Sequence, residues 1–251
     1  MSRIRTLSSL VAEAGQPARS KARAAPAEAA QPAGPQQGET AMRMLEIAER
    51  LFAEHGIEQV PLRQIVVESG QRNRSALHYH FGSREALVAH LLNMRLAHIN
   101  VLRNAYLDEV EAAGNAGDVR AIVHASISAL ADTVVKTTWG GSYLQVAAQT
   151  MFSPTLFSAD LLDKNALTGL VRTRKMIMAA LPDVPAKVMD YRLMWFNHGT
   201  VFSLADWYQR TRGEHRAPPV DELADYCTAG LTGPVTRTSG GTRRGGKART
   251  D

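Results

Sequence analysis

Apolar residues recur at helical spacing along most of the chain, and the first regular pattern begins at Thr40. Over residues 40–55 one side of a helix would carry the large apolar side chains, which are Met44, Leu45, Ala48, Leu51 and Phe52. Spacings of three, four and seven residues are typical of an amphipathic helix. Gly56 follows, and glycine readily adopts the left-handed conformation that ends helices. The pattern therefore predicts a first helix over 40–55.

Two shorter helices are predicted before residue 82. Pro61 suits the first position of a helix, because its φ angle is fixed and its missing N–H needs no partner there. Gly70 supplies a turn, and a third helix is expected to begin near residues 71–73. This third helix has two faces: three apolar residues return to the core, namely Ala76, Leu77 and Phe81, while its other side is polar.

A long fourth helix is predicted from Ser83, a good N-cap residue, to about residue 111. Glycines and prolines divide the rest of the chain, and further helical segments are predicted over 118–136, 139–152, 159–181, 186–212 and 220–231. Neither strand alternation nor an internal repeat is present. The sequence therefore predicts an all-α fold, with an N-terminal three-helix unit and a C-terminal helical domain.

The positive charge of the chain is concentrated at its two ends. Residues 1–38 carry five basic and two acidic side chains, and residues 232–251 carry five and one. Both segments are poor in large apolar residues, so we expect two disordered tails. Because the net charge of the whole chain is +5, the folded units expected at 39–86 and 87–231 together carry a net charge of −2. The basic character of the chain therefore does not indicate a basic surface on these units.

Several function classes are not indicated. A single cysteine, Cys227, excludes an intrachain disulfide and is typical of a reducing cytosol. No run of 18 apolar residues is present, so we expect a cytoplasmic protein with no membrane span. The chain lacks a Gly-rich phosphate loop, a G-x-S-x-G motif and a metal-spaced His/Cys cluster, so we expect no enzyme, cofactor or metal site. The side chains of His78 and His80 would point in different directions on a helix, so this pair does not indicate a metal site either.

A short helix, a glycine turn and a second helix with a polar face form the helix-turn-helix pattern, whose second helix enters the major groove of DNA. Arginine pairs with guanine and asparagine with adenine, each through two hydrogen bonds. The residues expected to contact DNA are Arg63, Arg72, Asn73, Arg74, Ser75, His78, Tyr79, His80 and Arg84. Of these, Arg63 and Arg84 are expected to hold phosphates. A merely solvated charged face is the alternative.

From Thr40 to about Leu92 the chain resembles the DNA-binding domain of the tetracycline-repressor (TetR) family of bacterial transcription regulators. The matching motifs are LFAEHGIEQ, LRQIVVESG, ALHYHF and SREAL. The resemblance implies DNA contacts at His78, Tyr79, His80 and Arg84. There are two departures from the family pattern: one additional residue between Gly70 and Phe81, and Val60-Pro61 in place of small hydroxyl residues before the second helix.

The resemblance also implies a ligand cavity and a dimer interface in the second domain. Aromatic and methionine side chains are the candidates for the cavity, namely Trp139, Tyr143, Met151, Phe152, Met176 and Trp195. Such a set is also typical of an ordinary helical core. The last two helices match the pair that usually forms the dimer, with Tyr191, Trp195, Gly199 and Phe202 along the first of them. Burial within one chain is the alternative.

These observations favour a homodimeric transcriptional repressor that binds a palindromic double-stranded DNA operator. A small hydrophobic or aromatic effector, of unknown identity, would release it by changing the distance between the two DNA-binding units. The alternative is a helical partner-binding or architectural DNA-binding protein without a small-molecule effector.

Overall fold

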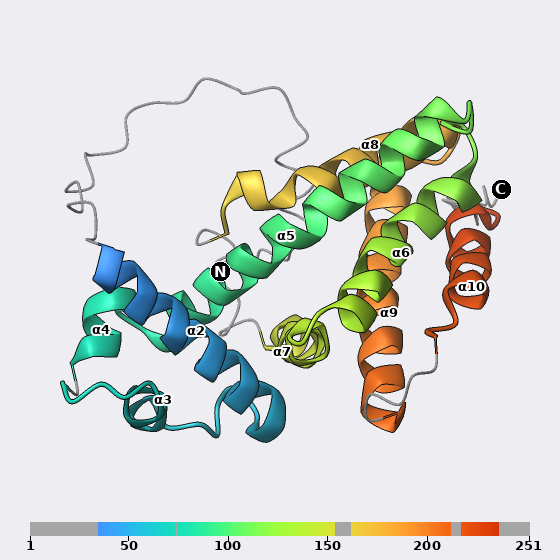
Figure 1. Ribbon diagram of the computed structural model, residues 1–251. Helices are drawn as coiled ribbons and strands as arrows, with labels where there is room; N and C mark the ends of the chain where they lie inside the picture. Colours follow the sequence, from blue (N-terminus) through green and yellow to red (C-terminus); the bar gives the residue numbers. More distant parts are fainter. Residues whose placement is uncertain (1–34, 74, 154–161, 212–216, 236–251) are drawn as a thin grey trace, which may run out of the picture.

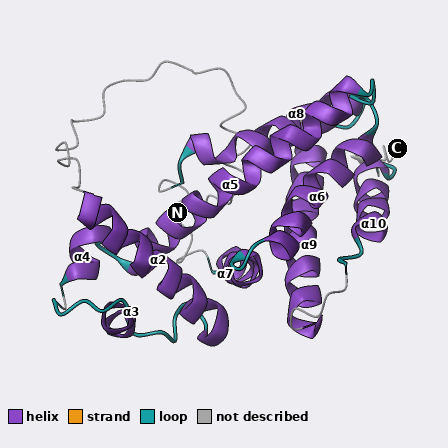
Figure 2. Ribbon diagram, in the orientation of Figure 1, coloured by secondary structure: helices purple, strands orange, loops and turns teal. Residues whose placement is uncertain are grey.

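The computed structural model of the protein describes residues 35–73, 75–153, 162–211 and 217–235. Every regular element within these ranges is a helix, which confirms the predicted all-α class (Figures 1 and 2). The elements are α2 (Pro35–His55), α3 (Leu62–Glu68), α4 (Ala76–Phe81), α5 (Arg84–Ala112), α6 (Val119–Lys136), α7 (Gly140–Phe152), the 3-10 turn η2 (Lys164–Leu167), α8 (Thr168–Ala180), α9 (Ala186–Thr211) and α10 (Val220–Thr232).

Helices α2, α3 and α4 form a small N-terminal unit, called the head below, against the start of α5. The predicted apolar face of α2 is buried, with Met44, Ala48 and Phe52 fully inside. The helix ends at His55 as predicted, and Gly56 has a φ of 95°. It begins five residues before Thr40, at Pro35, because proline is favoured in the first turn of a helix. The expected tail over 1–38 therefore includes the first helical turn, and 1–34 lie outside the described residues.

Helix α5 is the longest element and runs from the head to the far end of the molecule, with α8 beside it (Figure 1). Ser83 caps it as predicted, its side chain accepting the N–H of Ala86 at 3.1 Å. Apolar residues on more than one side of the helix are buried, among them Leu87, Leu91, Leu96, Ile99 and Leu107. Elements pack against both of its sides, and α5 connects the head to the second domain.

The second domain packs α6 between α5 and α10, while α7 lies between α2 of the head and α9 (Figure 1). Asp118 caps α6 by accepting the N–H groups of Arg120 and Ala121. Most boundaries match the predictions within one or two residues. The helix predicted over 159–181 differs: residues 154–161 are outside the described part, and the remainder is η2 followed by α8. No helix in the described ranges is long and apolar enough to cross a membrane.

Candidate nucleic-acid interface

The turn between α3 and α4 is longer than the sequence predicted. Gly70 has a φ of 75°, and its N–H bonds to the carbonyl of Val67 at 3.0 Å. Residues 71–73 are not helical, and α4 begins only at Ala76. The prediction that a helix begins near 71–73 is therefore wrong, and the additional residue of this segment is taken up in the turn.

Asn73 shows why the helix begins late. Its Oδ1 accepts the backbone N–H of Ser75 at 2.9 Å, and its carbonyl accepts that of Ala76 at 3.1 Å. A side chain that bonds its own backbone two residues on stabilises a turn in competition with a helix. Arg72, Asn73 and Ser75 are exposed ahead of α4 instead of lying along it, and Arg74 lies outside the described residues.

Helix α4 has the two faces that the sequence predicted. Ala76, Leu77 and Phe81 are buried, and the Phe81 ring packs edge-on against His90 of α5. On the other side His78 is exposed, Tyr79 is 73% exposed and His80 is half-buried. An exposed, polar short helix that follows a glycine turn is the geometry with which a helix-turn-helix unit enters a major groove.

The two arginines expected to hold phosphates occupy different environments. Arg63 projects from α3 into solvent. Arg84, at the start of α5, is partly buried, and its Nη1 donates to the carbonyls of Ile57 and of Val60, the latter at 2.8 Å. Arg84 therefore holds the connection between α2 and α3 through Nη1, and its expected phosphate contact stays a prediction.

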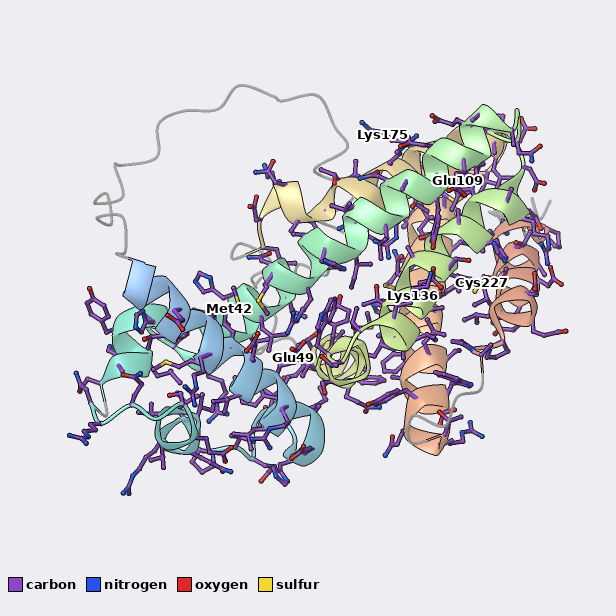
Figure 3. All side chains as sticks on the ribbon, viewed as in Figure 1. Met42, Glu49, Glu109, Lys136, Lys175 and Cys227 are labelled. Atoms are coloured by element: carbon purple, nitrogen blue, oxygen red, sulfur yellow. The ribbon has the colours of Figure 1, made fainter. Side chains whose placement is uncertain are left out.

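Two contacts between the head and the second domain had no signal in the sequence. Glu49 of α2 is buried on the side facing the second domain (Figure 3) and pairs with Arg95 of α5 through Nε, at 3.0 and 3.1 Å to the two carboxylate oxygens. The Arg95 guanidinium lies 4.2 Å over the ring of Trp139, just before α7. Burial raises the pKa of the Glu49 carboxyl, against the opposing hydrogen bond and charge of Arg95.

Gln149 of α7 forms the second contact. Its Oε1 accepts the N–H of Ile57 at 2.8 Å, and its Nε2 donates to the carbonyl of Phe52 at 3.0 Å. Both partners belong to the end of α2 and the loop after it, and the Phe52 carbonyl also accepts the N–H of Gly56 at 3.0 Å. The side chain of Gln149 thus fastens the head to α7.

The residues predicted to line an effector cavity lie in different environments. Tyr143 and Met176 are buried and Trp139 is half-buried, with 6.3 Å between the ring centroids of Trp139 and Tyr143. Phe152 is 76% exposed and Trp195 is 62% exposed, so neither lines an interior cavity of this chain. Met151 is half-buried at the end of α7.

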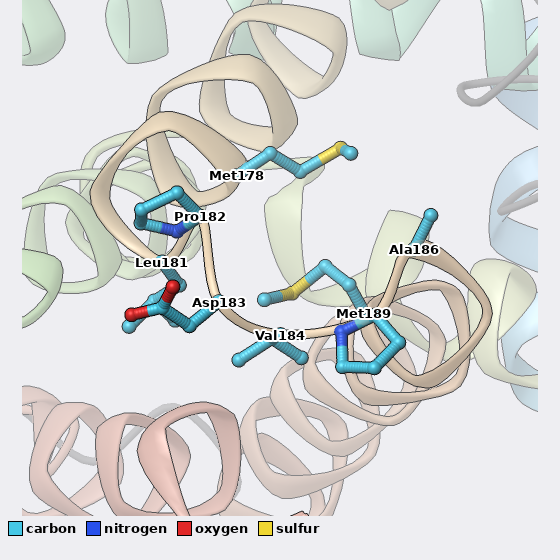
Figure 4. Close-up of a pocket in the computed structure, with 8 residues that line it drawn as sticks. Met178, Leu181, Pro182, Asp183, Val184, Ala186 and Met189 are labelled. Atoms are coloured by element: carbon cyan, nitrogen blue, oxygen red, sulfur yellow. The ribbon is translucent and has the colours of Figure 1, made fainter.

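A crevice of about 280 Å³ lies elsewhere, at the turn between α8 and α9 (Figure 4). Its lining is formed by Met178, Leu181, Pro182, Asp183, Val184, Pro185, Ala186 and Met189.

The predicted dimer residues are accessible on α9. Tyr191 and Trp195 are exposed and stacked, with ring centroids 6.0 Å apart. A Cβ at Gly199 would meet no heavy atom within 4 Å. Phe202, half-buried, packs against Phe152 of α7 with the two tilted rings 4.6 Å apart between centroids. This face of α9, defined by Tyr191, Trp195 and Gly199, is called the α9 face below.

Comparison with known proteins agrees with this geometry. Residues 44–91 match the family model described as bacterial regulatory proteins, tetR family. Among solved structures the chain is similar to a protein from Shewanella sp. PV-4 that is assigned to the tetR family of transcription regulators, with 16% identity and a TM-score of 0.53. The alignment covers 76% of this chain and 95% of that one, and at this identity it shows the fold alone. No curated protein sequence matches the chain.

Proposed function

We propose that the chain is a DNA-binding transcription regulator of the tetR family, and that it acts as a homodimeric repressor that a small-molecule effector releases from a palindromic operator. The observation that carries the proposal is α4. Its buried face fixes it on α5, while His78 and Tyr79 face solvent directly after the α3 turn. We propose that these side chains and His80 contact the operator, together with Arg63, Arg72, Asn73, Arg74 and Ser75.

The α9 face supports the homodimer. Large aromatic side chains that stack in the open, such as Tyr191 and Trp195, are typical of surfaces that another protein covers. A single recognition helix buries little surface, whereas a two-fold dimer reads two half-sites. We therefore propose that α9 pairs with the same helix of a second copy.

The contacts around α7 support a switch. Helix α7 contacts α2 through Gln149 and α9 through Gln145, whose Nε2 donates to the carbonyl of Ala205 at 2.9 Å. It therefore lies between the DNA-binding head and the proposed dimer helix. We propose that an effector in the second domain favours an arrangement of these helices in which the two heads no longer match successive major grooves. Its proposed place of action is the cytoplasm.

Selection of bound sequences from a random duplex library by the purified full-length protein tests this function. We expect an inverted repeat whose half-sites are separated by about one turn of DNA, or 10–10.5 bp. Sedimentation of the complex should give two chains on each selected site. A single half-site bound by one chain would contradict the dimeric reading, and binding without any sequence preference would favour the architectural alternative.

A further inference from the structure

The Arg95 side chain lies between one residue of the head and one of the second domain. It donates from Nε to both oxygens of the Glu49 carboxylate, at 3.0 and 3.1 Å, and from Nη2 to one of them at 2.5 Å. The guanidinium also lies 4.2 Å from the centre of the Trp139 ring, which attracts it by a cation–π interaction. These three residues are called the latch below. The side chains of Arg95 and Glu49 are only 12% and 3% exposed, so water screens their interaction little.

Trp139 is held in place by two helices of the second domain. Next to it, Gly140 packs so closely on α6 that a Cβ there would lie 2.3 Å from the Thr133 carbonyl oxygen. Gly141 lies against the ring of Tyr208 of α9, where a Cβ would lie 2.0 Å from Cζ. Only glycine permits either approach, and packing this close transmits any shift of a neighbour. The position of the Trp139 ring therefore follows α6 and α9, and α9 is the helix that carries the α9 face.

The latch lies two turns of helix away from other polar contacts that hold α2. The backbone of Ile57, just after α2, bonds the side chains of Gln149 on α7 and of Arg84 on α5. Glu49 precedes Ile57 by eight positions, which corresponds to about 12 Å along a helix. A helix held at one end can swing about that end, whereas a second contact at this distance fixes its direction. The latch therefore fixes the direction of α2 relative to the second domain.

The direction of α2 affects the position of α4, because α4 packs on both α2 and α5. In a two-fold dimer the two α4 helices must reach major grooves about 34–36 Å apart. Adjacent base pairs are separated by about 3.4 Å along the DNA. A shift of each head by about half of this distance would therefore match an operator with a spacer one base pair longer or shorter.

We propose that the latch determines which spacing between half-sites the dimer accepts, with Arg95 as the positioning residue. This inference rests on the proposed function and adds to it a determinant of specificity outside the DNA interface. Glu49 faces the second domain (Figure 3), so the pair acts on DNA through α2 and not by contact. A guanidinium that donates several hydrogen bonds to one carboxylate fixes their mutual orientation, which apolar contacts alone would leave less defined.

Two latch variants avoid leaving a buried charge without its partner. Glu49→Leu/Arg95→Met replaces both members of the pair by apolar side chains, a change that proteins often tolerate. Trp139→Leu keeps the pair and removes only the ring beside Arg95. Arg174→Met is the control, because the Arg174 side chain is 14% exposed and its ion pair with Asp190 lies within the second domain. Circular dichroism and the Tm establish that each variant is folded. If the double variant does not fold, Trp139→Leu decides.

The orientation of the head can be measured without DNA. Spin labels are attached to Val67→Cys on α3 and Lys175→Cys on α8, two exposed positions, in the full-length chain with Cys227→Ala. Dilution with unlabelled protein restricts pulsed electron paramagnetic resonance to distances within one chain. We expect a narrow distance distribution for the parent and the Arg174→Met control, and a broadened or displaced one for the latch variants. If folded latch variants keep the parent distribution, the proposal is wrong.

Operators of different spacing test the specificity itself. The probes are the inverted repeat selected by the wild-type protein and duplexes with a spacer one or two base pairs longer or shorter. For each wrong spacing we expect the wild type and Arg174→Met to lose about tenfold or more in affinity, because one half-site is misaligned, and the latch variants to lose less than about threefold. Latch variants that discriminate as sharply as the wild type would overturn the inference and leave the proposed function intact. A wild type without any spacing preference would contradict the proposed dimer, and with it this role of the latch.

Discussion

Polar side chains of the head differ in whether their hydrogen-bonding atoms are used within the fold. Arg84 Nη1 is engaged by two backbone carbonyls, and Asn73 Oδ1 by the turn that precedes α4. Tyr79, by contrast, extends into solvent from the outer face of α4. The Tyr79 side chain is therefore available to a DNA partner without a cost to the fold, whereas Asn73 can offer DNA only its atoms other than Oδ1.

Tyr79→Ala should therefore weaken operator binding and leave the stability of the protein unchanged. The side chain is largely exposed, and surface substitutions away from special features change the free energy of unfolding by no more than about 0.5 kcal/mol. Loss of one contact per half-site should weaken the Kd by about tenfold or more, measured by fluorescence anisotropy with a selected operator. Val101→Ala, an exposed position on α5, is the control. A Tm that falls with the Kd would show that Tyr79 supports the head instead.

Arg84→Met should lower the stability of the protein, whereas Arg63→Met should change only its DNA binding. Arg84→Met removes two hydrogen bonds from a charged donor, so urea unfolding should show a loss of about 1–3 kcal/mol. Arg63 is exposed on α3, so its loss should leave unfolding unchanged and reduce the salt dependence of DNA binding by about one unit of slope. Equal destabilisation by both changes would contradict this division of roles.

The sequence predicted which side of α4 faces outward, because burial of Leu77 and Phe81 follows from helical spacing. It did not predict the role of Arg84, since the carbonyls that it binds lie 24 and 27 residues away in the chain. It also placed Asn73 on the helix, because a short polar segment after a glycine is compatible with either a first helical turn or an Asx-type turn.

At the scale of whole elements, glycines, prolines and capping residues were reliable guides. Ser83, Asp118 and Gly56 lie at helix ends as their chemistry indicates. The packing of α7 between the head and α9 was not predictable, because its decisive side chain, Gln149, is an ordinary polar residue whose partners lie 92 and 97 residues away.

Gln149→Met should loosen the end of α2. The change leaves the Ile57 N–H without this partner, at a cost of about 1–3 kcal/mol if the group stays buried, whereas the Phe52 carbonyl keeps the N–H of Gly56. We expect faster hydrogen exchange at the Ile57 amide and weaker operator binding. Gln145→Met, one turn earlier on the same helix, removes a bond to α9 instead and should leave exchange at Ile57 unchanged. Equal acceleration in both variants would indicate a general loss of stability.

At the scale of the molecule, the described chain buries its apolar residues in one continuous core that extends from the head to α10. The sequence predicted helices with apolar faces for such a core but not which aromatic residues remain outside it. Trp195 and Phe152 resemble core residues by type, yet both are exposed, because helical spacing on α7 and α9 is apolar on more than one side. An aromatic residue on such a helix packs either within its own chain or against another.

Gly199→Leu separates these two possibilities on the α9 face. Within one chain a larger side chain at Gly199 has open space, and replacing a mid-helix glycine stabilises a helix by up to about 1 kcal/mol, so the monomer should be at least as stable. If α9 pairs with a second copy at this point, the leucine holds the helices apart, and sedimentation equilibrium should show dimerisation weakened by tenfold or more. Gly38→Leu makes the same change on α2, also in open space, and should leave the dimer intact. An undisturbed dimer in Gly199→Leu would place the interface on another face of the molecule.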